Sequence, residues 1–158
     1  MTAMQHAAGS RAGRTIHLLG NLLTVRAGAA DTEGGFSLVE ARTAPGAGSP
    51  PHVQTGDCEA FYVLEGRYEF ILGNERAIHG PGAFVYIPKG LPHGFRNAGD
   101  TVARMLIVNL PGGLHEAFFA EAGDEVADAS AFPPVGAPDV PRLAAAGARY
   151  GITLQPPA

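Results

Sequence analysis

Glycine and proline interrupt this chain so often that long helices have no room over most of its length. The 158 residues include 22 glycines and 13 prolines. They separate short runs rich in Val, Ile, Leu, Phe, Tyr and Thr, a pattern typical of β-strands joined by turns. The runs are Thr15–Leu19, Leu22–Ala27, Phe36–Arg42, Ala60–Leu64, Tyr68–Leu72, Arg76–His79, Ala83–Ile87, His93–Asn97 and Ala103–Asn109. With 46% hydrophobic and 16% charged residues the chain can bury a core, so the pattern predicts antiparallel strands closed into an all-β barrel or sandwich.

Two of the turns are short enough to form hairpins. Gly73-Asn74 lies between two neighbouring runs, and so does Gly99-Asp100. Gly, Asn and Asp adopt the positive φ angles that two-residue hairpin turns require. We therefore predict a hairpin at each of these positions.

The pattern changes after Leu110. The segment Gly113–Gly123 places Leu114, Phe118 and Phe119 on one face of a helix, with glutamates elsewhere. The Pro-rich stretch that follows has no periodicity and is expected to be a linker over the surface.

A second helix is expected near the C-terminus. Asp139 precedes Pro141 as an N-cap precedes a first-turn proline, and Gly151 is a plausible helix stop. We therefore divide the chain into a flexible N-terminal arm (1–14), a β-barrel (15–110) and a helical, Pro-rich extension packed on the barrel (111–158).

Charge and cysteine content restrict the partners and the compartment. The 11 basic and 15 acidic residues give a net charge of −4 with no basic stripe, so nucleic acid and anionic membranes are not expected partners. The N-terminal residues lack the continuous apolar stretch of a secretory signal, and no run is long enough for a membrane span. The single cysteine, Cys58, cannot form an internal disulfide. These features predict a cytoplasmic protein.

Two segments carry histidines and a glutamate at fixed distances from glycine and proline. The positions are Gly46, His52, Gln54, Glu59 and Gly66 in the first segment, and Gly82, Pro88, Gly90, His93 and Asn97 in the second. They resemble the two motifs of the cupin superfamily, G(x)5HxH(x)3-4E(x)6G and G(x)5PxG(x)2H(x)3N. The second motif matches at every specified position, and the first departs only at Gln54, where the family has its second histidine. The resemblance implies a cupin-type jelly-roll β-barrel.

The residues of the first segment support a metal site by their spacing. His52 and Gln54 are two apart, so on a strand they project from the same face. Glu59 follows a tight Thr-Gly-Asp turn, and the next strand can bring its carboxylate alongside them. Two imidazoles and one carboxylate, with His93 from the second motif, suit non-haem iron and related metals. The alternative is a hydrogen-bonded Glu–His pair without a metal, because a buried carboxylate needs a partner in either case.

A narrower resemblance concerns activity. The stretch Pro50–Phe70 and the C-terminal RYGI are similar to small single-domain cupins described as quercetin 2,3-dioxygenase-like. That resemblance implies one divalent transition metal (Fe, Mn, Ni, Co or Zn) held by His52, Glu59 and His93, with Gln54 in the fourth ligand's place. It also implies dioxygenase chemistry on a small enolic or phenolic, flavonol-like substrate, with Glu59 as the catalytic base.

Other functions and an assembly state stay open at this level. Cupin barrels host many activities, so a non-catalytic small-molecule-binding cupin and a metal-assisted isomerase or lyase are the competing hypotheses. An all-β barrel leaves edge strands that must be covered, and the family pairs its barrels through such edges. We therefore expect a homodimer.

Gln54 is where the chain departs from the family. Its amide oxygen can coordinate a metal, but it is a harder and weaker donor than an imidazole nitrogen. We therefore predict metal binding weaker than in a four-ligand cupin, and tighter binding in a Gln54→His variant. Alternatively, Gln54 leaves the metal and hydrogen-bonds the substrate or a water.

The remaining histidines and the cysteine carry less information. His17, His79 and His115 lie outside both motifs and are interpreted as surface or capping residues. Cys58 precedes Glu59 directly, so on a strand it faces the other way and is interpreted as a small packed thiol.

Overall fold

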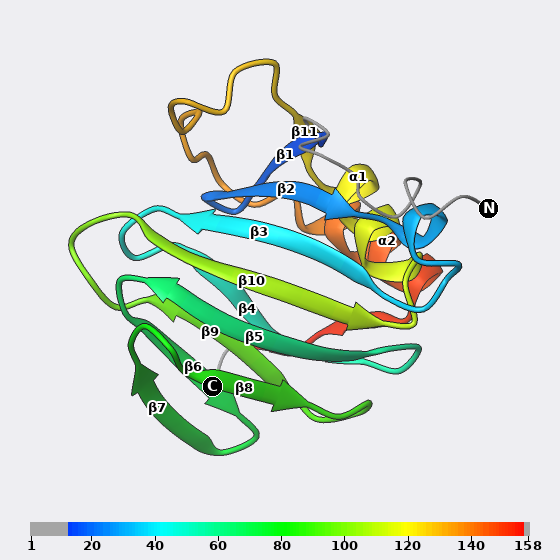
Figure 1. Ribbon diagram of the computed structural model, residues 1–158, viewed down its shortest axis with the longest axis horizontal. Coiled ribbons are helices and arrows are strands. Elements are labelled where there is room, and N and C mark those ends of the chain that lie inside the picture. Colours follow the sequence, from blue (N-terminus) through cyan, green and yellow to red (C-terminus); the bar gives the residue numbers. More distant parts are fainter. Residues whose placement is uncertain (1–12, 157–158) are drawn as a thin grey trace, which may run out of the picture.

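The computed structural model describes residues 13–156 and consists of two antiparallel β-sheets that face each other, with two helices at one end (Figure 1). The larger sheet has the strand order β11–β1–β2–β3–β10–β5–β8. Its strands are β1 (Thr15–Leu18), β2 (Asn21–Ala27), β3 (Ser37–Thr43), β5 (Cys58–Glu65), β8 (Phe84–Ile87), β10 (Ala103–Leu110) and β11 (Asp124–Glu125). This architecture is the jelly-roll cupin fold, which confirms the predicted fold class.

The smaller sheet has the order β12–β4–β9–β6–β7. Its strands are β4 (Gly48–Gln54), β6 (Tyr68–Leu72), β7 (Glu75–His79), β9 (His93–Asn97) and β12 (Ile152–Leu154). Strand β4 and the short strands β11 and β12 are not among the runs identified in the sequence. β4 is missed because Gly48, Pro50 and Pro51 dilute its β-forming residues.

The core lies between the sheets and follows the two-residue alternation of the strands. In β3, every second residue from Ser37 to Thr43 is buried. Phe61 of the larger sheet contacts Phe70 and Phe95 of the smaller one, with ring centroids 5.3 and 5.6 Å apart. Because rings from both sheets interlock, this cluster fixes the spacing of the sheets at the centre of the barrel.

One of the two predicted hairpins is present. Gly73 has φ +57° and Gly73-Asn74 joins β6 to β7 as an antiparallel pair. The prediction of a hairpin at Gly99-Asp100 is wrong, because β9 pairs with β4 and β6 while β10 pairs with β3 and β5. The turn carries the chain from one sheet to the other. Asn97 stabilises this crossing by donating its amide hydrogens to the carbonyls of Thr43 and Thr101.

Both predicted C-terminal helices are present, α1 at Leu114–Ala122 and α2 at Val140–Tyr150. The predicted caps of α2 are confirmed: the Asp139 side chain accepts a hydrogen bond from the Arg142 amide, and Gly151 is left-handed with φ +73°. Elsewhere in the described chain, the only helical turn is a 3-10 turn at Ala29–Asp31. The helices contact each other, α1 also contacts β1, and α2 contacts β12 (Figure 1).

Most of the predicted N-terminal arm, residues 1–12, lies outside the described residues. Arg14, at its end, forms an ion pair with Glu125 of β11 at 2.8 Å. Within residues 13–156 no helix has the length and apolar character needed to cross a membrane. The cytoplasmic location remains a prediction from the sequence.

Candidate metal centre

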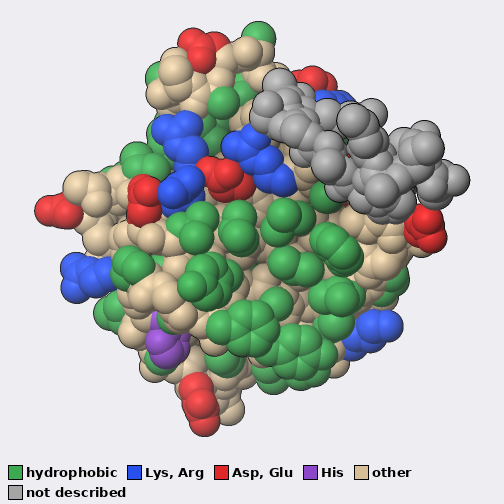
Figure 2. Space-filling view, in the orientation of Figure 1, with side chains coloured by type: hydrophobic (Ala, Val, Ile, Leu, Met, Phe, Trp, Pro, Cys, Tyr) green, Lys and Arg blue, Asp and Glu red, His purple; other side chains and the backbone are tan. Residues whose placement is uncertain are grey.

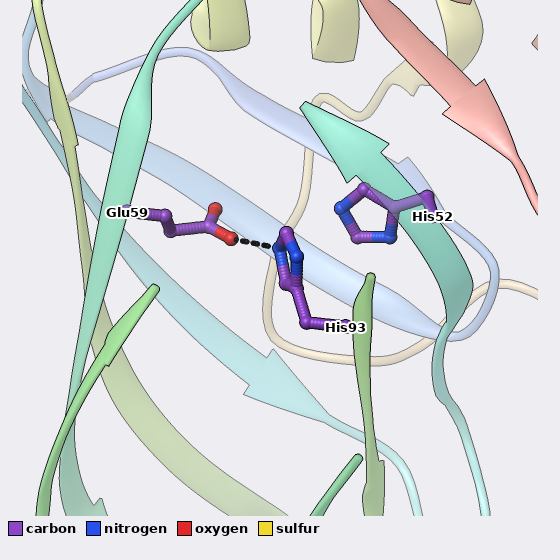
Figure 3. Close-up of side chains that lie close together, drawn as sticks. All are labelled: His52, Glu59 and His93. Carbon is purple, nitrogen blue, oxygen red and sulfur yellow. Dashed lines mark hydrogen bonds and ion pairs between the residues drawn. The ribbon is translucent and has the colours of Figure 1, made fainter. Parts of the chain in front are cut away.

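Three strands bring His52, Glu59 and His93 together between the sheets (Figure 3). His52 on β4 and His93 on β9 are directly paired across the smaller sheet, and their rings lie 4.3 Å apart. Glu59 reaches them from β5 of the opposite sheet. All three side chains are buried, and one donor atom from each lies within 4.8 Å of the other two. These residues are therefore arranged as a group that could bind one metal ion.

The backbone fixes which nitrogen each imidazole offers. His52 Nδ1 lies 2.9 Å from the carbonyl oxygen of Pro50, and His93 Nδ1 lies 2.8 Å from that of Leu91. A carbonyl only accepts hydrogen bonds, so each Nδ1 carries the proton and donates it. In the neutral rings the lone pair is therefore on Nε2. Such a carbonyl partner on the other ring nitrogen is typical of metal-ligating histidines.

The contact between Glu59 and His93 tests whether a metal ion fits. His93 Nε2 lies 2.9 Å from Glu59 Oε2. With the His93 proton on Nδ1, this contact places a lone pair against a carboxylate oxygen. Such a pair requires a cation between the two atoms, either a proton or a metal ion. The donor set of two imidazole nitrogens and one carboxylate suits a divalent transition metal, so the residues fit the ion that the sequence predicts.

The electrostatics of the site favour a metal-binding state at neutral pH. Burial, together with repulsion from His93, lowers the pKa of His52 to about 4, so this ring is neutral. Burial raises the pKa of Glu59, but His115, His93 and His52 lower it by more, to about 2. The carboxylate is thus ionised. Protons at pH 7 compete weakly with a metal for either residue.

The pKa of His52 predicts acid destabilisation of the metal-free protein. Its ordinary value of 6.5 falls to about 4 on folding, so between these values the unfolded state binds a proton that the folded state does not. The free energy of unfolding should therefore decrease as the pH falls through this window, by about 3 kcal/mol. Glu59 decreases the free energy of unfolding further as the pH falls below its ordinary pKa of 4.5, because its pKa in the folded protein is about 2.

Urea unfolding of the wild type and of a His52→Gln variant across pH 4 to 7 measures this effect. The variant lacks the titrating ring, so its stability should decrease less over the same range. Parallel profiles would show that His52 keeps its ordinary pKa in the folded protein.

Gln54 is buried on the same face of β4 as His52. Its Nε2 lies 2.9 Å from Asp57 Oδ1 and 2.9 Å from His115 Nδ1. Its Oε1 is buried and has no hydrogen-bond partner among residues 13–156. The predicted role of Gln54 as a fourth ligand stays a prediction, and the unpaired oxygen is the atom that would coordinate.

The interpretation of His115 as a surface or capping residue is wrong. His115 lies on the inward face of α1, is 4% exposed, and contacts Phe119 edge-to-face at 4.6 Å. Its Nε2 lies 3.5 Å from Glu59 Oε1. Burial lowers its pKa, but Glu59 and Asp57 raise it by more, so the net shift is upward. The buried helix face consists of His115, Phe118, Phe119 and Ala122, and Leu114 is only half-buried.

A small apolar cavity of about 40 Å³ opens next to two of the three donors, His52 and Glu59. Its polar lining also includes Asn21, Ser49 and His115. Its apolar wall includes Leu23, Phe95 and Ile107 of the barrel and Phe118, Leu143 and Ile152 of the C-terminal extension. Among the described lining residues there is no lysine or arginine. Helices α1 and α2 therefore close the barrel over the site.

Comparison with known proteins agrees with this geometry. Residues 39–109 match the model of the cupin domain family. This stretch of the chain is therefore similar to cupin domains. It contains every residue of both motifs and all three clustered donors, whereas His115 and the helices of the extension lie outside it.

The similar proteins share the cupin fold and differ in the functions attached to them. The chain is 34% identical over 80 residues to an uncharacterized protein of Methanocaldococcus jannaschii, which covers 51% of this chain and 64% of that protein's length. A predicted oxalate decarboxylase of Thermotoga maritima has a TM-score of 0.60 at 17% identity, covering 65% of this chain and 98% of its own. The polyketide cyclase RemF of Streptomyces resistomycificus has a TM-score of 0.53 at 27% identity, and the match covers 64% of this chain and 70% of that protein.

Proposed function

We propose that this protein is a metal-dependent cupin enzyme, a dioxygenase that acts on a small enolic or phenolic substrate. The observation that carries the proposal is the donor set: two Nε2 lone pairs and one ionised carboxylate, buried next to a cavity. Three protein donors leave open positions on an ion for a substrate and a second small molecule. The metal-free Glu–His pair would leave that cavity without a chemical purpose.

The cavity supports a substrate that is largely apolar and carries one acidic oxygen. A polyanion such as a sugar phosphate needs cationic side chains, and the described lining has none. At about 40 Å³ the cavity is smaller than the roughly 150 Å³ cavity that holds benzene. A compact enol therefore fits the cavity of this structure better than a three-ring flavonol does. Entry of an aromatic ring would require movement of Phe118 and Leu143 in the extension.

Glu59 is the proposed base. A divalent ion bound by the cluster would polarise the substrate oxygen and acidify its hydroxyl. With a pKa of about 2, Glu59 accepts a proton readily only from such an acidic hydroxyl. The Asn109 amide donates to Glu59 Oε1 at 3.2 Å and holds the carboxylate in place. The apolar walls exclude water from the reacting oxygen.

A second candidate is an oxygen-independent isomerase, lyase or cyclase. The 27% identity to a polyketide cyclase supports it, because cyclisation of a ketone chain also proceeds through an enol. Both candidates use the same base and the same metal, and they differ in whether dioxygen is consumed. A non-catalytic binding cupin is the third.

Oxygen uptake by metal-reconstituted protein distinguishes the three candidate functions. The probes are 2,4-pentanedione as a compact acidic enol, catechol as a single-ring phenol and quercetin as a flavonol. We expect uptake with the compact enol and none in a Glu59→Gln variant. Conversion of a probe without dioxygen would favour the isomerase class, and binding without conversion would favour the binding module.

We also propose that the protein is a homodimer. The outer face of the larger sheet exposes Tyr62, Phe84 and Tyr86, with exposed fractions of 44%, 66% and 53% (Figure 2). The last two lie on β8, the edge strand of that sheet. An exposed apolar face beside an open edge is typical of a surface that pairs with a second copy.

Phe84→Glu is expected to convert the dimer to a monomer, because it places a charge on this apolar face at its edge strand. Light scattering should give twice the chain mass of 16.3 kDa for the wild type and the chain mass for the variant. Val135→Glu, at a 60% exposed site in the Pro-rich segment, is the matched control and should stay dimeric. A wild-type monomer would refute the proposal.

A further inference from the structure

Asp57 is a buried carboxylate that neither motif specifies, although it lies between Gln54 and Glu59 of the first, and the proposed mechanism does not use it. It ends the turn between β4 and β5 and is 1% exposed. Its Oδ1 accepts a hydrogen bond from Gln54 Nε2 at 2.9 Å, and its Oδ2 accepts one from Asn109 Nδ2 at 3.1 Å. His115 Nδ1 lies 3.5 Å from Oδ2. Asp57 therefore holds side chains from β4 and β10 and lies against α1.

These contacts determine the orientation of the Gln54 amide. An ionised carboxylate oxygen only accepts hydrogen bonds, so the atom that Gln54 turns toward Asp57 must be its nitrogen. The second hydrogen of that nitrogen is directed to His115 Nδ1 at 2.9 Å. Both amide hydrogens are thus used. The other end of the amide, Oε1, has no partner and is completely buried.

The unpaired oxygen points to a ligand. A buried polar atom without a hydrogen bond is unfavourable, and few remain in folded proteins. Gln54 shares the inward face of β4 with His52, one of the three clustered donors. A divalent cation beside that donor would satisfy the oxygen without any further hydrogen-bond donor.

His115 links the same amide to Glu59. When the ring is neutral, its Nδ1 accepts from Gln54 and its proton lies on Nε2, which faces Glu59 Oε1 at 3.5 Å. Phe118 and Phe119 flank the ring at 5.9 and 4.6 Å and restrict its position. The group of donors within 4.8 Å of one another contains His52, Glu59 and His93 and omits His115. His115 therefore lies beside this group of donors and is not one of them.

We propose that Asp57 and His115 are positioning residues that hold the amide nitrogen of Gln54 and so present its Oε1 as a fourth protein donor to the metal ion. The inference rests on the proposed metal centre. It explains how a glutamine serves where an imidazole would otherwise be expected. Without the two partners the amide can turn its nitrogen toward the ion, and an amide NH2 has no lone pair to donate.

The test is Co²⁺ titration of the full chain, followed by its visible absorption, in the wild type and in Asp57→Asn. Asparagine has one acceptor oxygen where aspartate has two, so it cannot accept from both Gln54 and Asn109. We expect binding about 10-fold weaker and a changed absorption spectrum at saturation. Asp128→Asn, which removes an exposed carboxylate, should match the wild type in both.

His115→Phe is the second variant and decides the question if Asp57→Asn does not fold. It keeps an aromatic ring between Phe118 and Phe119 but removes the acceptor for the amide. The same change of spectrum and weaker binding are expected. Wild-type spectra in the folded variants would overturn the positioning roles, even with weaker binding, while leaving the metal centre intact. A wild type that binds no Co²⁺ would refute the metal centre and, with it, the proposed function.

Discussion

Glu59→Gln is expected to weaken divalent metal binding by about 100-fold or more, because it removes the only negative charge among the three clustered donors. The two imidazoles that remain are neutral and leave the charge of the ion uncompensated in a buried site. The loss should appear with every divalent metal, since it is a loss of charge rather than of a preferred donor type.

The variant is expected to remain folded, so the loss can be assigned to the site. A glutamine amide has the shape of the carboxylate and can keep both of its main contacts. Its oxygen can accept from Asn109, as Glu59 Oε1 does at 3.2 Å. Its nitrogen can donate to the lone pair on His93 Nε2, which lies 2.9 Å from Oε2 in the wild type.

Isothermal titration with Mn²⁺, Co²⁺ and Zn²⁺ and thermal unfolding without metal are the measurements. The matched control is Glu65→Gln, at the other end of β5, where an exposed carboxylate pairs with Arg104 at 2.8 Å. It should bind metal as the wild type does. If Glu59→Gln also binds with wild-type affinity, Glu59 is not a ligand and the metal-free Glu–His pair is the correct interpretation.

The fold could be predicted because local signals agree with it. Most strands combine β-forming residues with a two-residue alternation, and glycine marks their ends. The error at Gly99-Asp100 has a physical reason: a short Gly-Asp segment between two strands looks the same in sequence whether the strands pair or enter different sheets, and here residues 98–102 connect β9 to β10. Only the hydrogen bonding of β9 and β10 to other strands distinguishes the two.

The candidate site was predictable where residues have fixed spacing and not where the tertiary structure brings them in. His52, Glu59 and His93 lie in motifs, whereas His115 comes from a helix 22 residues further along the chain than His93. A signal for His115 existed, because it lies three residues before Phe118 and so shares its face of the helix. Asp57 also left a signal, since it is two residues before Glu59, a spacing that puts both side chains on one side of an extended segment.

The three strands and the helix therefore contribute in different ways. The motif residues of β4, β5 and β9 supply the clustered donor atoms, which the packing of the two sheets brings together. The extension supplies His115 and part of the apolar wall of the cavity, and it lies outside residues 39–109, the stretch that matches the cupin domain. Donor identity is thus a property of the barrel. The shape of the cavity and the orientation of Gln54 depend on how α1 packs.

Gln54→His should tighten binding of Ni²⁺ and Zn²⁺ by about 100-fold and of Mn²⁺ by much less, because imidazole nitrogen favours the former while amide oxygen suits the latter. Both side chains are neutral, so the charge of the site does not change.

The surroundings of Gln54 can accommodate the new ring. Asp57 can accept from its Nδ1, as the carbonyls of Pro50 and Leu91 do for the other two imidazoles. That contact would leave the Nε2 lone pair for the metal. Parallel titrations of the wild type and the variant with all three metals provide the measurement, and Mn²⁺ serves as the internal control. If the wild type already binds each metal stoichiometrically and the substitution changes none of the affinities, then Gln54 is not a weak ligand. Its oxygen would then accept a hydrogen bond from the substrate or from a water, which is the alternative that the sequence left open.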